Sequence, residues 1–289
     1  MASLFGGKQA TDVSAAEVWL GVTDSADFTL VTARVENATS LEPGAFERCA
    51  NDAYRAIAGA LHRGPHRHPV RFWNHIPHIR RTNDDGLDRY MVFNAGRFAA
   101  CSKWFGGPAA FDRLLPTASA VGHDGADLVV HALAGNDPGI AVESPRQVPS
   151  YRYSRRFGPR PPCFARATVL NGSGDGRAFI LVAGTASIRG EETVHLGDVR
   201  GQTLETFENL SVLVEAAAAA VGPAVPADGN FEALRRFRDL RVYFVRERDR
   251  ATVVGMVAAA LPHLRNVEYV RADLCRPDLL VEIEGTAGI

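Results

Sequence analysis

Two glutamates near the end of the chain have a spacing that could serve acid chemistry. The segment DLLVEIEG, residues 278–285, alternates strictly, with apolar residues on one side and Glu282 and Glu284 on the other. Such alternation predicts a β-strand. Both carboxylates can simply face water. If their face instead closes over a cavity, burial or a like-charged neighbour would raise a carboxyl pKa, so that one glutamate could act as an acid near neutral pH.

Arginines gather in YRYSRRFGPRPPCFARA, residues 151–167. The planar guanidinium group binds a carboxylate through two parallel hydrogen bonds, which makes arginine well suited to an anionic substrate. Arg160 lies between prolines in a stiff loop, and Arg166 lies on the strand that follows. We expect these two to bind carboxylates, with Tyr153 adding a hydroxyl hydrogen bond. The alternative is an exposed basic connector.

Small and hydroxyl-bearing residues end the predicted strand AGTASIRG, residues 183–190. Gly184 would let a ligand or another backbone approach closely, and Thr185 offers a hydroxyl at the strand end. A simple bend in the chain explains the same residues. Cys275 precedes Glu282 by seven residues, and a buried cysteine is most often an inert apolar residue.

The composition narrows the class of protein. A chain of 289 residues that is 46% hydrophobic and 22% charged predicts one large domain or two ordinary ones. A net charge of −1 gives no basic field for nucleic acid or a membrane surface. Four scattered cysteines without a C-x-x-C favour a reducing compartment. No apolar run suits a signal peptide or a membrane span, so we expect a cytoplasmic protein.

Two other motifs give little evidence of a metal site or a phosphate site. The histidines of HRGPHRHP, residues 62–69, invite a zinc interpretation, but Pro65 interrupts the helical spacing and no matching ligand stands nearby. We expect a solvated turn and no metal. The segment NGSGDG, residues 171–176, lacks the G-K-[ST] of a phosphate-binding loop, and it is typical of a turn.

The rest of the chain must position these residues. The first half predicts strands, helices and a loop at residues 17–22 (strand), 27–35 (strand), 43–63 (helix), 69–76 (strand), 86–105 (helix), 106–125 (loop) and 126–135 (strand). After a turn-rich connector, residues 136–162, the second half predicts 163–170 (strand), 177–188 (strand), about 203–221 (helix), 239–247 (strand), 250–264 (helix), 266–274 (strand) and 278–285 (strand).

The two halves follow the same order of elements. DLVVHALAG can be laid over DLLVEIEG, which matches His131 with Glu282 and Leu133 with Glu284. The unit therefore does not need carboxylates at these positions in order to fold, which favours a function for at least one of them. We expect an α+β protein made of two units, each a mixed sheet with helices packed on one face. The predicted units are residues 1–145 and 146–289.

Several of these motifs together resemble the chorismatase family, over roughly residues 70–289. They are RFWNHIPHI with GLDRYMVFNAGR in the first half, and GPRPPCFARA, GTASIRGEETVHLGDVRGQTLETFENL and LLVEIEG in the second. The resemblance implies two RidA/YjgF-like (chorismate mutase-like) units, of which the second carries the catalytic glutamate. Arg89 and Tyr90 in the first-half motif fit either a site between the units or simple packing.

Chorismate carries two carboxylates and an enol ether that joins a pyruvyl unit to a cyclohexadiene ring. Release of pyruvate requires protonation of the terminal carbon of the enol ether, and hence a neutral carboxylic acid. The resemblance implies that Glu282 is this acid. It also places Gly184, Thr185 and Cys275 at the pocket wall, while Arg160, Arg166 and Tyr153 would hold the carboxylates.

The resemblance also implies the product. Cys275 together with Gly184 is similar to the chorismatases that make 3-hydroxybenzoate, in which the ring hydroxyl of the substrate, and not water, meets the protonated intermediate. No metal or organic cofactor is implied, and Cys275 is not a nucleophile. The alternatives are hydrolysis to a dihydroxycyclohexadiene carboxylate, a RidA-like imine hydrolase and a non-catalytic binding module. Monomer and homotrimer both remain open.

Overall fold

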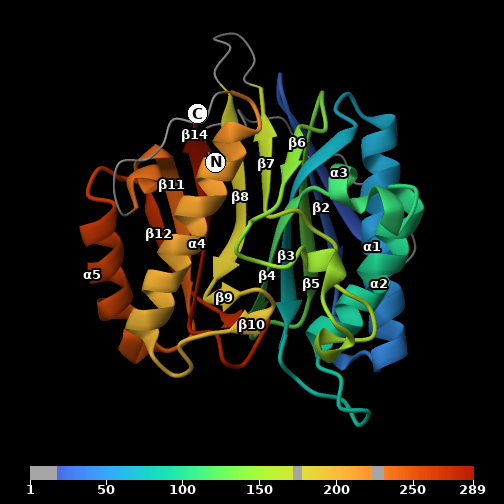
Figure 1. Cartoon of the computed structure of the whole chain (residues 1–289). Helices are drawn as coiled ribbons and strands as arrows, with labels where there is room; N and C mark the ends of the chain where they lie inside the picture. The colour runs from blue at the N-terminus through green and yellow to red at the C-terminus, as the bar shows by residue number, and fades with distance from the viewer. Residues whose placement is uncertain (1–17, 172–177, 223–230) are drawn as a thin grey trace.

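A computed structural model describes residues 18–171, 178–222 and 231–289. Two six-stranded sheets lie side by side, each with its own helices (Figure 1). The first half contains β1 (Trp19–Asp24), β2 (Thr29–Val35), α1 (Pro43–Arg63), β3 (His68–Pro77), α2 (Arg89–Trp104), α3 (Phe111–Leu114), β4 (Thr117–His123) and β5 (Leu128–Gly135).

The second half repeats this order with small additions. It contains β6 (Ile140–Val142), β7 (Ala167–Leu170), β8 (Phe179–Ala186), β9 (Ile188–Arg189), β10 (Glu192–Thr193), α4 (Val199–Ala219), β11 (Phe237–Phe244), α5 (Arg250–Ala260), β12 (Val267–Arg271), β13 (Asp273–Leu274) and β14 (Val281–Gly288). β7 and β8 form the predicted antiparallel pair. The predicted turn NGSGDG between them lies, apart from Asn171, outside the described residues.

The sheet topology confirms the predicted repeat. The first sheet has the order β1-β2-β5-β3-β4, and the second has the equivalent order β7-β8-β14-β11-β12. β3 pairs in parallel with β4, as β11 does with β12. Each sheet also gains one edge strand, because β13 joins β4 and β6 joins β7. The α+β class with two units is therefore correct, while the boundary between residues 145 and 146 stays a prediction.

One predicted loop is wrong. Residues 117–123, TASAVGH, form β4, although residues 106–125 were expected to have no regular structure. The segment contains few β-branched or aromatic residues, which are the usual sign of a strand. Six of its seven residues are nevertheless buried, because β4 pairs with β3 and β13 within the first sheet and also contacts β8 of the second. Small side chains suit this crowded position, so packing determined the strand where local preference did not.

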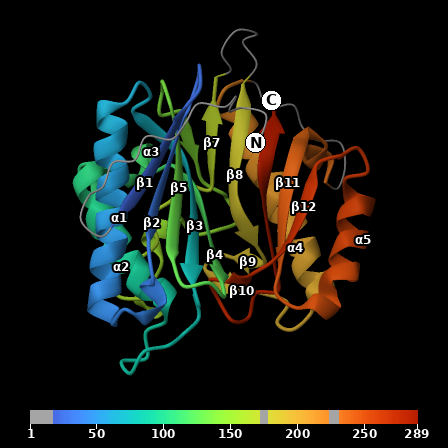
Figure 2. The same cartoon turned by 180° about the vertical axis from the view of Figure 1, so that it is seen from behind.

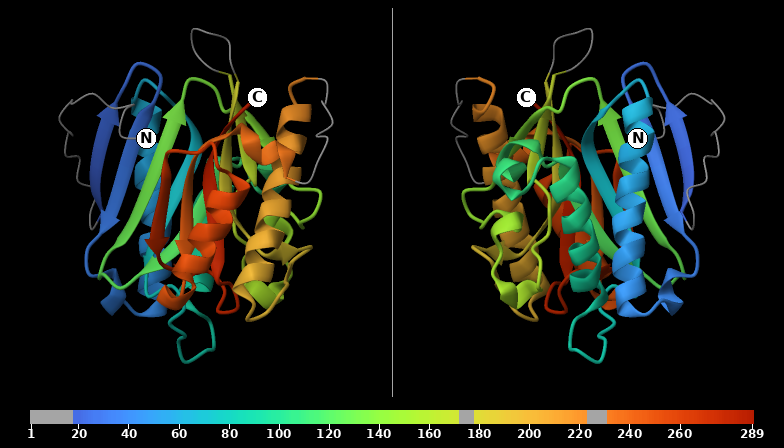
Figure 3. Two further views of the ribbon diagram at one scale, coloured as in Figure 1. Left: turned by 90° about the vertical axis from the view of Figure 1, so that its left-hand side faces the viewer. Right: turned by 90° about the vertical axis from the view of Figure 1, so that its right-hand side faces the viewer.

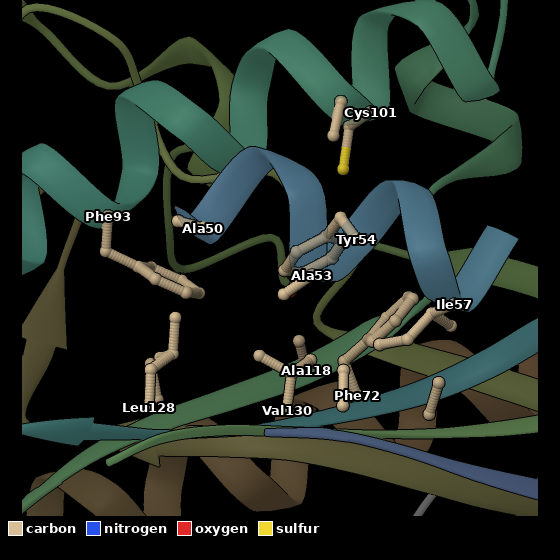
Figure 4. Close-up of a cluster of buried hydrophobic side chains, with 14 of the residues drawn as sticks. Ala50, Ala53, Tyr54, Ile57, Phe72, Phe93, Cys101, Ala118, Leu128 and Val130 are labelled. Carbon is tan, nitrogen blue, oxygen red and sulfur yellow. The ribbon is translucent and has the colours of Figure 1, made fainter. Parts of the chain in front are cut away.

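The helices follow from local sequence signals and cover one face of each sheet. Pro43 occupies the first turn of α1, and the apolar residues that follow at helical spacing face the strands (Figure 4). Gly96 lets α2 lie close to α1, because a Cβ atom there would be 2.1 Å from the carbonyl oxygen of Glu47. In the described part of the chain, none of the helices has the length and apolarity needed to cross a membrane.

The opposite faces of the sheets are free of helices, as the reverse and side views show (Figures 2 and 3). The two units meet there through two apolar clusters. One joins Trp73 and Leu133 of the first unit to Leu181 of the second. The other joins Val121 of β4 to Tyr243 of β11. Residues of both units therefore come together at the junction, where the candidate site lies.

Candidate active site

A cavity of about 400 Å³ lies at the junction of the two units. We call it the central cavity. The first unit contributes residues of α2 and β4, and the second contributes residues of β8, β14 and the loops that precede β7 and β14. Five of the predicted site residues line it, and they are Tyr153, Arg166, Gly184, Cys275 and Glu282.

Glu282 lies at the wall of the central cavity and is almost completely enclosed. It is only 4% exposed, although it belongs to a strand that ends near the chain terminus. Burial, together with the nearby negative charge of Glu284, raises the pKa of Glu282 to about 8, although Arg71 and Arg166 oppose the shift. The carboxyl group is therefore mainly protonated at pH 7 and can donate a proton.

A β-bulge makes room for this carboxyl group. The register between β8 and β14 shifts, so that Ala183 and Gly184 lie opposite the single residue Glu284. A Cβ atom on Gly184 would be 2.0 Å from Oε1 of Glu282, so any side chain here would force the carboxyl group to move. The Gly184 amide donates a hydrogen bond to Oγ of Ser119 on β4, at 2.8 Å. The glycine therefore permits the close approach of the acid in its present position.

Two predicted residues do not line the central cavity. The bulge changes the alternation of β8, so that Thr185 turns away and its hydroxyl donates to the carbonyl of Ala183 at 3.0 Å. Arg160 is exposed and lies over the ring of Phe98, 5.2 Å from its centre. The prolines beside Arg160 do make a stiff loop, but that loop directs the guanidinium away from the cavity.

Glu284, two residues beyond the acid, has a different environment. Oε2 accepts a hydrogen bond from Nη2 of Arg71 at 2.8 Å. Oε1 accepts hydrogen bonds from the indole of Trp73 at 3.1 Å and the hydroxyl of Tyr243 at 3.2 Å. The two carboxylates therefore share one face of β14 but differ in role, since Glu284 is in an ion pair and Glu282 is not.

Two buried guanidinium groups line the central cavity. Arg166 donates to the hydroxyl of Tyr153 at 2.6 Å, and Arg97 of α2 donates to the carbonyl of Cys163. They are 2% and 1% exposed. Within the described residues, neither is in an ion pair, and the Nε atom of each has no hydrogen-bond partner. Against the effect of burial, the nearby carboxyl group of Glu143 raises the pKa of Arg166 but forms no ion pair with it. Buried cations that form no ion pair are costly, so this cavity suits an anionic ligand.

The sequence analysis did not single out Arg97. Arg97 lies in the first-half motif, on α2, which faces the second unit. That motif contains residues that matter for folding as well as residues that could form a site, so the motif alone did not identify Arg97 as a site residue. Arg71 was missed as well, although a charged residue inside the apolar strand segment VRFW was a usable signal.

The structure decides between the two interpretations of Arg89 and Tyr90. Tyr90 lines the central cavity, and burial raises the pKa of its phenol, so the hydroxyl stays protonated. Arg89 instead donates to the carbonyl of Ala38 at 2.7 Å and lies over the ring of Phe46, so it is a packing residue.

Cys275 and Arg276 close the cavity on the side of β14. Burial, together with the neighbouring Glu282, raises the pKa of the Cys275 thiol to about 12. The thiol is therefore neutral and suits a wall of the cavity better than a nucleophile. Arg276, which the sequence analysis also missed, lies over the ring of Phe157 at 3.9 Å and donates to the carbonyl of Glu191 at 2.7 Å.

Comparisons with known proteins agree with this arrangement. The family model of the FkbO/Hyg5-like chorismatase N-terminal region matches residues 6–134. The 3-hydroxybenzoate synthase of Streptomyces hygroscopicus is 34% identical over 245 residues, which cover 84% of this chain and 70% of that protein. A chorismatase of Streptomyces rapamycinicus is 36% identical over 219 residues, which cover 75% of this chain and 63% of that protein.

A solved structure extends the likeness to the fold. A crystal structure of a chorismatase matches 97% of this chain and 80% of its own, with 28% identity and a TM-score of 0.80. Fold and site define a two-unit α+β protein with a protonated carboxyl group beside buried arginines. The chain belongs to the chorismatase family, which confirms the resemblance drawn from its motifs.

Proposed function

We propose that this protein converts chorismate to 3-hydroxybenzoate and pyruvate. The observation that carries the proposal is the combination, in one cavity, of a carboxyl group that is protonated at neutral pH and two buried arginines that form no ion pair within the described residues. An acid that donates a proton and cations that bind carboxylates are the two requirements that chorismate chemistry sets.

The charges of the cavity match a dianion. Chorismate brings two carboxylates, and the central cavity offers Arg97 on the side of the first unit and Arg166 on the side of the second. Tyr153, which accepts a hydrogen bond from Arg166, orients that guanidinium. We assign the substrate carboxylates to Arg97 and Arg166. Arg160, which lies outside the cavity, is not part of this assignment.

The reaction begins at Glu282. Its carboxyl group donates a proton to the terminal carbon of the enol ether, and the positive charge that results is shared by the adjacent carbon and the ether oxygen. The ring hydroxyl of the substrate attacks this cation and gives its proton to the Glu282 carboxylate, which produces a cyclic ketal that joins the two ring oxygens. The ring carbon–oxygen bond of the former hydroxyl then breaks, the oxygen takes up a proton, and the neighbouring ring carbon loses its proton to the Glu282 carboxylate, so that the ring becomes aromatic. The hemiketal that remains on the other ring oxygen collapses to the phenol and pyruvate. The two products together contain the atoms of chorismate, so no net water is consumed.

The shape of the cavity decides between this course and hydrolysis. If water reached the cation first, the product would be a dihydroxycyclohexadiene carboxylate. The neutral thiol of Cys275 and the Gly184 position, both beside Glu282, support the 3-hydroxybenzoate course, as does the printed name of the Streptomyces hygroscopicus relative. Incubation of purified protein with chorismate, followed by mass spectrometry of the products, distinguishes the two. Absence of chorismate consumption would exclude both.

Glu282→Gln should abolish turnover without unfolding the protein. The amide is close in shape to the protonated acid but cannot donate a proton of comparable acidity, and we expect a loss on the order of 100-fold or more in kcat. In the wild-type protein, Glu282 loses its proton as pH rises and can no longer act as an acid. The kcat should therefore fall above a pH of about 8, where Glu282 ionises.

Glu215→Gln, at an exposed position of α4, is the control for this substitution and should keep full activity. Circular dichroism should show the same fold for both variants. Full activity in Glu282→Gln would show that another residue is the acid.

A further inference from the structure

The second carboxylate of β14 forms a buried ion pair with a residue of the other unit. Arg71 lies on β3, and Glu284 lies more than two hundred positions later in the chain, yet Nη2 and Oε2 are 2.8 Å apart. Both side chains are about 95% buried or more. Trp73 and Tyr243 donate to the remaining carboxylate oxygen, so the negative charge of Glu284 has three donors around it.

The same guanidinium reaches the bulge that accommodates the acid. Nη2 of Arg71 donates to Oγ of Ser119 at 2.6 Å, and Nη1 donates to the carbonyl of Val182 at 2.9 Å. Ser119 in turn accepts the hydrogen bond of the Gly184 amide at 2.8 Å. A continuous set of hydrogen bonds therefore runs from Glu284 through Arg71 and Ser119 to the residue against which the Glu282 carboxyl packs.

We propose that Arg71 and Glu284 are positioning residues for Glu282, and that the pair sets both the place of the acid and the charge that it faces. The inference rests on the proposed function, in which Glu282 is the acid. The pair lines a second groove and not the central cavity, so it acts on the acid through hydrogen bonds and charge.

The groups around Glu282 show why this pair matters. Glu284 contributes a negative charge from the same strand, and the groups on the packed elements are Arg71 on β3, Tyr90 on α2, Arg166 before β7, Tyr243 on β11 and Cys275 before β14. The phenols and the thiol are neutral. After burial itself, Glu284 is the strongest influence that raises the pKa of Glu282, and Arg71 is the strongest that lowers it.

The test is the pH dependence of Glu284→Gln. The substitution removes a negative charge beside the acid and leaves Arg71 unpaired, and both changes favour ionised Glu282. We expect the high-pH limb of the kcat profile to move to lower pH by roughly one unit. An infrared titration of the protonated carboxyl band, identified by its loss in Glu282→Gln, should show the same displacement without any substrate.

A double variant and a matched control show whether the Arg71–Glu284 pair acts on Glu282 or only holds the two units together. Arg71→Met with Glu284→Gln removes both charges, and the limb should move in the same direction but less far, because the influence of Glu284 is the larger one. Asp273→Asn removes another ion pair between the units, with Arg80 at 2.6 Å, and should leave the limb unchanged.

The outcomes are distinct. The positioning role is wrong if folded Glu284→Gln has the same high-pH limb of the kcat profile as the wild type, or if Asp273→Asn moves that limb equally. If Glu284→Gln does not fold, the double variant decides, and an unmoved limb in that variant refutes the inference. If the wild-type protein leaves chorismate unchanged, the proposed function fails, whereas the infrared titration still shows whether Glu284 controls the protonation of Glu282.

Discussion

Two glutamates separated by one residue acquire opposite properties in this protein. Glu282 faces a cavity in which, among the described residues, its carboxyl group accepts no hydrogen bond, and burial keeps it protonated at neutral pH. Glu284 is surrounded by three donors from two strands, which are Arg71 and Trp73 on β3 and Tyr243 on β11. A protonated acid next to an ion-paired carboxylate is a known way to separate two carboxyl roles by environment alone.

The raised pKa of Glu282 predicts a pH-dependent stability. The folded protein holds this proton up to a pH of about 8, whereas an unfolded chain releases it near the ordinary value of 4.5. The free energy of unfolding should therefore fall as pH rises between these limits, by up to about 1.4 kcal/mol per unit from this group. Glu282→Gln lacks the group, so its stability relative to the wild type should increase with pH.

Urea denaturation of both proteins at several pH values from about 5 to 8 measures this difference. Glu215→Gln on α4 should show a constant offset from the wild type across the same range. Parallel curves for Glu282→Gln and the wild type would mean that the carboxyl group is not buried in its neutral form.

At the scale of elements, the bulge in β8 decides which side chains the cavity contains. Without it, strict alternation would continue from Leu181, which faces the other sheet, and would bring Thr185 to the same face. The extra residue instead places Gly184 and Ala186 at the cavity and turns Thr185 away. A bulge beside an active site that redirects one side chain is a frequent use of this irregularity.

Gly184→Ala should therefore displace the acid. The added methyl group would lie 2.0 Å from Oε1 of Glu282, so the carboxyl group must move. We expect kcat to fall on the order of 100-fold, since small displacements of a reacting group have large effects, and the free energy of unfolding to fall by about 1–3 kcal/mol.

Gly255→Ala is the matched control, because a Cβ atom at this position of α5 meets no atom within 4 Å. That change should leave turnover intact and stabilise the protein by up to about 1 kcal/mol. Turnover in Gly184→Ala equal to that of Gly255→Ala would contradict the proposed role of the bulge.

At the scale of the whole molecule, neither unit forms the site alone. Arg97 and Ser119 come from the first unit, while Arg166, Gly184 and Glu282 come from the second. The units are joined by apolar clusters that contain residues of both, and by edge strands. β13, which follows α5 and β12 of the second unit in the chain, pairs with β4 of the first. Catalysis in this arrangement depends on the junction remaining closed.

We therefore expect the protein to unfold in one cooperative step. Separation of the units would expose the apolar clusters and the Arg71–Glu284 ion pair together, which opposes a stable intermediate with one folded unit. Calorimetry should show a single transition whose calorimetric and van't Hoff enthalpies agree. Asp273→Asn should lower the temperature of that transition without dividing it. Two resolved transitions would show that the units fold independently.

Much of this architecture follows from local pattern. The alternation of residues 278–285 determined that Glu282 and Glu284 share one face of a strand, and the repeated order of elements determined two similar α+β units. The spacing of apolar residues after Pro43 determined α1. Such features depend on residues that are neighbours in the chain, so a sequence displays them directly.

Other features exist only in the folded chain. β4 is a strand because it is buried where the first sheet contacts the second, and Thr185 turns away because of a bulge opposite Glu284. Arg160 is exposed, although Arg166 nearby lines the cavity. Above all, the protonation of Glu282 depends on burial by a unit that precedes it in the chain and on charges such as Arg71. Burial and charge act through space, and their partners here are distant in the sequence, so only the tertiary structure decides which of two similar carboxylates is the acid.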